Sequence, residues 1–67
     1  MSGDGWRTAE QMAAEWGTTP RIVIGYVVKL GLRDTTAHAR GHGSAREYSP
    51  EAQGLIHREW RSYGGPA

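Results

Sequence analysis

Hydrophobic residues recur with helical spacing in the first part of the chain, between two break signals. Apolar side chains separated by the steps i, i+3, i+4 and i+7 form one stripe, at Ala9, Met12, Ala13 and Trp16. Thr8 and Gln11 occupy the two positions of a capping box, and Gly17 is suited to end a helix. The pattern predicts a helix over Ala9–Trp16.

A second apolar stripe begins a few residues later. Its members repeat the helical spacing, at Val23, Tyr26, Val27 and Leu30. Thr19 followed by Pro20 is a strong helix start, because proline lacks the N–H that would be unpaired in the first turn. Residues 22–28 are also rich in β-branched side chains, which would suit a buried strand. The Thr-Pro start and the glycine at Gly31 favour a helix.

The last third of the chain repeats the helix signal, and the segment before it has a different character. Ser49-Pro50-Glu51 starts the helix, Gly64-Gly65-Pro66 ends it, and its apolar stripe is Ala52, Leu55, Ile56 and Trp60, with Tyr63 beyond the stripe. Residues 33–47 contain Gly41, Gly43 and Ser44, which indicates a two-stranded β-hairpin with an exposed tip. We therefore expect a mainly α fold with a small β-hairpin wing, the winged helix-turn-helix arrangement.

The length of 67 residues allows one domain. We place it at residues 6–63, between a flexible leader at 1–5 and a flexible tail at 64–67. The start of the chain lacks the basic and apolar segments of a signal peptide. The longest apolar stretch, residues 22–28, is much shorter than the about 20 residues that span a bilayer. We expect a cytoplasmic, nucleoid-associated protein without a membrane partner.

Charge is distributed unevenly, although the net charge is only +1. Residues 21–46 hold four arginines and one lysine against one aspartate, a local charge of +4. The segments on both sides, residues 1–20 and 47–67, each hold three acidic residues and fewer basic ones. A basic centre between acidic ends indicates either one face that meets a polyanion or an ordinary solvated loop with arginines.

Four runs of residues carry a resemblance to a known family: Thr8-Ala9-Glu10-Gln11-Met12-Ala13, Gly17-Thr18-Thr19-Pro20-Arg21, Tyr26 with Gly31-Leu32, and Arg46-Glu47-Tyr48-Ser49-Pro50-Glu51-Ala52. In this order they resemble the winged helix of mercury-resistance (MerR-type) regulators, over about residues 6–62. The chain departs from that family in three ways. The helix before Gly31 is one residue longer, Ile24-Gly25-Tyr26 replaces an Arg-Tyr-Tyr-like run, and no long dimerisation helix follows.

These departures make the chain more similar to the compact relatives, such as phage and plasmid excisionases and small regulators. The resemblance implies sequence-specific binding of double-stranded DNA, by a transcription regulator or a recombination directionality factor (excisionase). It also implies that the second helix enters the major groove and that the wing follows the minor groove or the backbone. Several copies would then bind neighbouring DNA repeats.

The expected DNA-binding residues fall into three groups. They are Thr18, Thr19, Arg21, Ile22 and Gly25 at the start and in the first half of the second helix, Lys29 and Arg33 as phosphate contacts at the base of the wing, and Arg40, Gly41, His42 and Arg46 in the wing. Arg21 would pair with a guanine or hold a phosphate. The two threonines would donate to phosphates while also capping the helix, so their binding role is not separable from their structural one. Ile22 and Ile24 would contact thymine methyl groups or, as is more frequent, lie in the core. Arg46 would contact DNA or brace Tyr48.

Two other functions stay open. Lys29-Leu30-Gly31 also resembles the amino-terminal domain of the bacterial initiation factor that delivers initiator tRNA, which would imply an RNA- or ribosome-associated module. The apolar second helix would equally suit a protein-interaction module derived from a winged helix. Trp60 and Tyr63 belong to the core or form a surface for self-association or a partner protein.

The sequence gives no support for an enzyme. It contains no cysteine, no phosphate-binding glycine loop and no nucleophile motif. His38 and His42 are four residues apart, but no third metal ligand follows at a useful spacing, and His57 is isolated. We expect a binding protein without catalytic residues, metal or cofactor.

Overall fold

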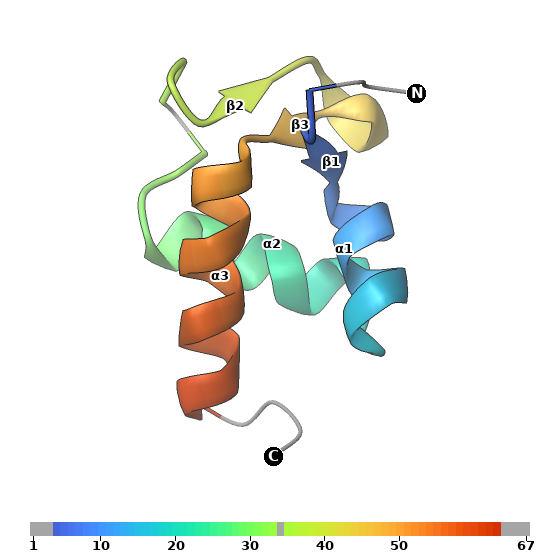
Figure 1. The fold of residues 1–67 in the computed structure, drawn as a ribbon, viewed down its shortest axis with the longest axis vertical. Coiled ribbons are helices and arrows are strands. Elements are labelled where there is room, and N and C mark those ends of the chain that lie inside the picture. The colour runs from blue at the N-terminus through green and yellow to red at the C-terminus, as the bar shows by residue number, and fades with distance from the viewer. Residues whose placement is uncertain (1–3, 34, 64–67) are drawn as a thin grey trace.

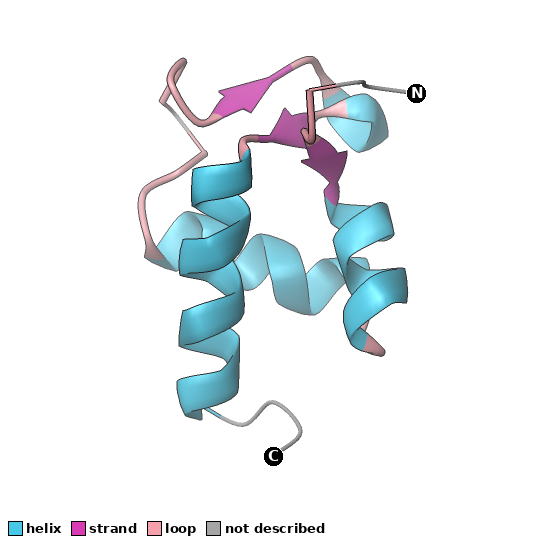
Figure 2. Ribbon diagram, in the orientation of Figure 1, coloured by secondary structure: helices cyan, strands magenta, loops and turns pink. Residues whose placement is uncertain are grey.

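The computed structural model describes residues 4–33 and 35–63. Its elements follow the order β1 (Arg7–Thr8), α1 (Ala9–Trp16), α2 (Pro20–Lys29), β2 (Ala39–Arg40), the short 3-10 helix η1 (Gly43–Ala45), β3 (Glu47–Tyr48) and α3 (Pro50–Tyr63). The described part of the chain is thus mainly helical with a small sheet (Figure 2). Residues 1–3 of the expected leader, and the whole expected tail at 64–67, lie outside the described residues.

Each α-helix begins at a side-chain cap that the sequence predicts. The backbone N–H of Gln11 donates to the Thr8 hydroxyl over 3.1 Å, and the Gln11 side chain accepts from the backbone of Thr8 over 2.8 Å. Thr19 accepts from the N–H of Ile22, and Ser49 from that of Ala52. These bonds pair N–H groups that a first helical turn leaves without a partner. The helix prediction for residues 22–28 is confirmed, and the strand alternative is wrong.

The turn between α1 and α2 is short because Gly17 ends α1 in a left-handed conformation, with φ of 74°. Only glycine adopts this φ without steric cost. Thr18 then donates its backbone N–H to the carbonyl of Ala13 over 2.9 Å, which closes the end of α1. After one further residue Pro20 begins α2. The two helices therefore cross steeply, and Figure 1 shows α2 running behind α1 and α3.

The core lies where the three helices meet, and α2 contacts both of the others. The largest fully buried side chains are Met12, Val23, Val27 and Ile56. The sheet closes one end of this core with Ala39 and Tyr48. Trp60, expected either in the core or at a partner surface, is only 6% exposed and belongs to the core. Tyr63, expected with it, is 65% exposed.

The sheet has three strands, one more than the sequence predicts. The expected hairpin is present, since Ala39 pairs with Tyr48 and Arg40 with Glu47 in antiparallel register. It is shorter than residues 33–47, because most of that segment forms turns and η1. Strand β1 adds to the other side of β3, so that the strand order is β1-β3-β2. Two-residue strands are too short to show an alternating pattern.

The expected apolar stripe of α3 is wrong at one position. Leu55 is 46% exposed, whereas its neighbours in the stripe, Ala52 and Ile56, are fully buried. The apolar stripe of α3 is wider than the part of α3 that the core covers, so Leu55 at its edge lies in solvent. None of the helices in the described residues has the length and hydrophobicity that crossing a membrane requires.

Candidate nucleic-acid interface

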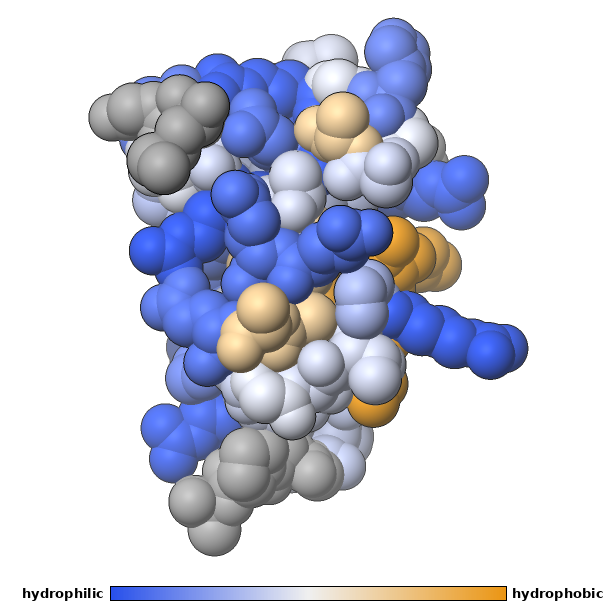
Figure 3. Space-filling model, turned by 90° about the vertical axis from the view of Figure 1, so that its right-hand side faces the viewer, coloured by the Kyte–Doolittle hydropathy of each residue, from blue (hydrophilic) through white to orange (hydrophobic). Residues whose placement is uncertain are grey.

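The outward face of α2 carries hydrophobic side chains. Ile22, Ile24 and Val28 are 44%, 45% and 52% exposed, while Val23 and Val27 are buried against the other helices. The expectation that Ile22 and Ile24 lie in the core is therefore wrong. In Figure 3 strongly hydrophobic atoms gather at the right-hand edge of the molecule, beside hydrophilic ones, at the side to which the rotation from Figure 1 brings α2.

Arg21 shares this face with the exposed apolar residues. Positions 21, 24, 25 and 28 follow the helical spacing i, i+3, i+4 and i+7, so they form one stripe on α2 opposite the buried one. Arg21 is exposed and has no ion-pair partner among the described residues. The sequence of α2, PRIVIGYVVK, contains no acidic residue. The stripe is therefore both cationic and apolar.

Gly25 lies in the middle of this stripe, and the fold does not require a glycine there. Its φ is not positive, and an added Cβ would meet no atom within 4 Å. A glycine inside a helix costs about 0.5–1 kcal/mol relative to alanine. The lack of a side chain leaves the backbone of α2 accessible between Arg21 and Val28, which suits a close approach by a binding partner.

A hollow of about 320 Å³ separates α2 from the tip of the β2–β3 hairpin. Its lining residues come from three segments that are separate in the sequence, and they are Ile24, Val27, Arg33, Gly43, Arg46 and Tyr48. Of the predicted DNA-binding residues, the fold brings Arg33 and Arg46 to this hollow, and the others do not line it. Arg33 is exposed at this hollow and, like Arg21, has no ion-pair partner within the described part of the chain.

Arg46 holds the hairpin against the segment that follows α2. One of its terminal nitrogens donates to the carbonyl of Gly41 over 3.0 Å, and the other donates to the carbonyl of Arg33. Gly41 has φ of 87°, and a Cβ there would lie 3.2 Å from the carbonyl oxygen of Ala45. Both residues are therefore needed to shape the tip. Arg46 therefore has a structural role through backbone carbonyls, and not through Tyr48, which the sequence analysis named as its structural partner.

Arg40, the other expected wing arginine, is bound at the edge of the sheet. Its guanidinium forms ion pairs with Asp4 over 2.7 Å and with Glu47 over 3.0 Å, and it lies 4.4 Å from the ring of Trp6. The hydrogen bond that Arg40 donates to the Asp4 carboxylate is the main cause that raises the pKa of Arg40 above its usual value, and Glu47 adds to it. Because guanidinium stays charged at all physiological pH values, these contacts fix a cation on the hairpin.

The remaining expected site residues divide between capping, pairing and exposure. Lys29 faces α3, where its ammonium lies 3.5 Å from Glu59 and 3.4 Å from the ring centre of Tyr63. Thr18 and Thr19 serve the helix ends described above. His42 is exposed at the start of η1, and its side chain makes no capping hydrogen bond there.

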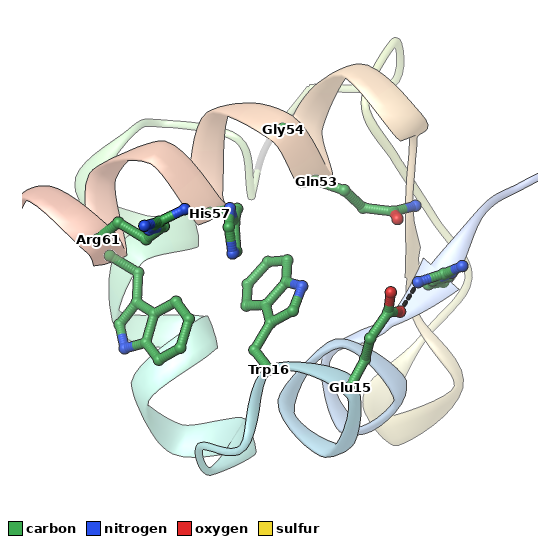
Figure 4. Close-up of a pocket in the computed structure, with 8 residues that line it drawn as sticks. Glu15, Trp16, Gln53, Gly54, His57 and Arg61 are labelled. Carbon is green, nitrogen blue, oxygen red and sulfur yellow. Dashed lines mark ion pairs between the residues drawn. The ribbon is translucent and has the colours of Figure 1, made fainter. Parts of the chain in front are cut away.

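A second, larger hollow of about 610 Å³ lies between α1 and α3, and the sequence analysis did not anticipate it. Figure 4 shows Trp16 pointing into the space between the two helices, toward His57 of α3. Trp16 stacks on Trp60 at 5.7 Å, and its ring centre lies 4.8 Å from that of His57. An ion pair between Arg7 and Glu15 lies at its margin, as the dashed line shows. The sequence did not indicate this cluster, because Trp16 is far along the chain from His57 and Trp60.

No group of three or more histidine, cysteine or acidic side chains in the described residues could hold a metal ion. No family model, curated protein or solved structure matches this chain. The function must therefore be inferred from the chemistry of the exposed face of α2 and of the two hollows.

Proposed function

We propose that this chain binds double-stranded DNA as a winged helix-turn-helix module, with α2 in the major groove and the β2–β3 hairpin against the adjacent backbone. The observation that carries the proposal is the shared hollow, where α2, Arg33 and the hairpin tip meet. A helix beside a hairpin of small residues matches the shape of a major groove next to a phosphate backbone. Regulator and excisionase are both roles in which such a module acts.

Charge supports this choice of partner. Arg21 lies on the exposed stripe of α2, Arg33 lies at the hollow, and α2 brings no carboxylate near them. Arg40 adds a cation at the hairpin. To bind a phosphate, its guanidinium would have to give up its ion pairs with Asp4 and Glu47. Phosphate contacts release counterions, so each one contributes about −0.9 to the slope of log affinity against log salt.

The test is a titration of a fluorescent DNA duplex over a series of salt concentrations. Arg21→Ala and Arg33→Ala should each weaken binding by about tenfold at low salt, the order of one charge-assisted hydrogen bond. Each should also reduce the steepness of the salt dependence by about 1. Arg58→Ala is the matched control, because Arg58 is exposed on α3 and the substitution removes the same charge outside the proposed interface.

Two results would overturn the proposal. The first is a folded wild-type protein that does not bind the duplex at low salt. The second is equal weakening by all three arginine variants, which would show that only net charge matters. A duplex RNA of the same sequence serves as a further control, because the deep and narrow major groove of A-form RNA does not admit a helix.

A second candidate is a protein-interaction module, and the exposure of Ile22, Ile24 and Val28 favours it. Apolar side chains this close together on one helix are a frequent feature of protein interfaces. In that case the face would bind a partner without a steep salt dependence, and the arginine variants would have little effect.

A further inference from the structure

The exposed stripe of α2 has an unusual chemistry for a helix that contacts base edges. Its side chains Ile24 and Val28, and Ile22 beside it, can neither donate nor accept a hydrogen bond, and Arg21 is the polar member of the stripe. Tyr26 is half-buried. A helix with this surface cannot distinguish base pairs mainly by hydrogen bonds, as arginine, asparagine and glutamine side chains do.

We propose that α2 recognises the C5-methyl groups of pyrimidines in the major groove, which thymine and 5-methylcytosine carry. This inference rests on the proposed function and specifies its ligand. The methyl group is the one apolar feature that a base pair presents in the major groove. Burying it against Ile24 or Val28 removes apolar surface from water on both sides, whereas the same side chains gain nothing from cytosine or uracil.

The geometry of α2 suits this contact. Ile24 and Val28 lie one helical turn apart, about 6 Å along the helix axis. Base pairs follow one another at about 3.4 Å along the DNA axis, so side chains at this separation can contact different base pairs of one major groove. Gly25 lies between them, and the space around its Cα is open, so that the backbone of α2 can approach the groove floor.

Charge commits the face to a polyanion rather than to another apolar protein surface. Arg21 lies on the apolar stripe itself, and Arg33 stands beside Ile24 at the hollow. A symmetric contact with a second copy would bring two copies of each arginine into one apolar interface, and α2 offers no carboxylate to pair them. Phosphates on both sides of a major groove instead supply the opposite charge.

The test uses two pairs of synthetic duplexes that differ only in the methyl group. The first pair is alternating poly(dA-dT) and poly(dA-dU), and the second is alternating poly(dI-dC) and the same polymer with 5-methylcytosine. Wild type should bind the methylated member of each pair about fourfold more tightly for each methyl group that it buries. The salt dependence should be the same for both members, because the phosphates are unchanged.

A double variant, Ile24→Ala with Val28→Ala, should bind both members of each pair equally. Both positions are about half exposed, so the variant should stay folded, which circular dichroism checks. Leu55→Ala is the matched control, because Leu55 is 46% exposed on α3 and its loss should leave the preference intact.

The outcomes separate this inference from the function on which it rests. Equal binding of methylated and unmethylated duplexes by wild type would overturn methyl recognition and leave DNA binding in place. Absence of binding to every duplex would overturn both. A preference that survives in the double variant would also contradict the inference. So would wild-type self-association in sedimentation that the double variant abolishes, because the face would then be an interface between copies.

Discussion

The two hollows of this molecule differ in how far their side chains satisfy one another. In the larger one, between α1 and α3, Trp16 stacks on Trp60 and Arg7 pairs with Glu15. In the smaller one, beside α2, Ile24 is 45% exposed and Arg33 has no ion-pair partner among the described residues. The larger hollow also holds an exposed arginine without an ion-pair partner among the described residues, Arg61, so what sets the smaller hollow apart is the exposed apolar face of α2 beside it.

The largest expected effect is the loss of stability when a core side chain is truncated, compared with the same truncation at the exposed face of α2. Ile56→Ala should lower the free energy of unfolding by about 2–5 kcal/mol, because Ile56 is fully buried and the variant leaves a cavity. That is of the order of the whole stability of so small a domain. Ile24→Ala removes the same atoms at an exposed position and should change it by less than about 0.5 kcal/mol. Urea unfolding followed by circular dichroism measures both.

A similar loss in the two variants would mean that α2 buries Ile24 in solution and that its outward face is not available. The binding surface would then have to be sought elsewhere, beginning with the α1–α3 hollow. Two variants that are both as stable as the wild-type protein would contradict the description of the core.

The helices were predictable from the sequence because their ends are encoded locally. Thr8 with Gln11, Thr19 with Pro20, and Ser49 each act within four residues, and each cap forms as expected. Helix α1 agrees at both ends, since Gly17 stops it through its own backbone conformation. The arrangement of one hairpin between α2 and α3 was also predictable, from its glycines.

The contacts between distant residues were not predictable. Strand β1 has two residues and forms only because β3 offers it an edge. Arg40 was expected to contact DNA directly, but its pairing with Asp4 joins positions 36 residues apart. By contrast, the side of α2 that the core covers was predictable, since Val23 and Val27 of the expected stripe are buried and Tyr26 and Leu30 pack against the core, which leaves Ile22 and Ile24 outside.

The helix caps provide the next effect, of about 1 kcal/mol. Thr8→Ala removes the hydroxyl that pairs the N–H of Gln11 and should lower the free energy of unfolding by about that amount. Since Thr8 caps α1 and does not lie on α2, the affinity of the folded protein for DNA should be unchanged. Thr19→Ala should cost a similar stability and also weaken DNA binding, because it loosens the start of α2. Unfolding and DNA titrations on the same two samples measure the contrast, and equal effects on affinity would contradict it.

Two glycines inside helices give a matched pair with a smaller effect. Gly25 lies on the outward stripe of α2 and Gly54 lines the α1–α3 hollow, and an added Cβ meets no atom within 4 Å at either position. Each change to alanine should raise the free energy of unfolding by about 0.5–1 kcal/mol. Only Gly25→Ala should weaken DNA binding, by about tenfold if it removes one close contact. Loss of affinity in Gly54→Ala instead would place the DNA at the larger hollow.

The smallest expected effect is the change in DNA affinity when a surface ion pair is removed. One such pair lies at α2 and another at the α1–α3 hollow. Glu59→Gln removes the carboxylate that holds Lys29 at 3.5 Å and leaves that lysine available for a phosphate. Lys29 lies one turn beyond Gly25 on α2, so the affinity for DNA should rise about twofold to fivefold, and the salt dependence should steepen by up to about 1. Stability should change by less than about 1 kcal/mol, since exposed ion pairs contribute little.

Glu15→Gln is the control for this gain, because it alters net charge by the same amount and releases Arg7 on the α1–α3 side. If DNA meets α2 and the hairpin, Glu15→Gln should raise affinity only through the general change in net charge, and the difference between the two variants isolates Lys29. Titrations at two salt concentrations measure that difference. Equal gains would show that DNA responds to total charge alone, whereas a larger gain in Glu15→Gln would move the interface to the aromatic side of the molecule.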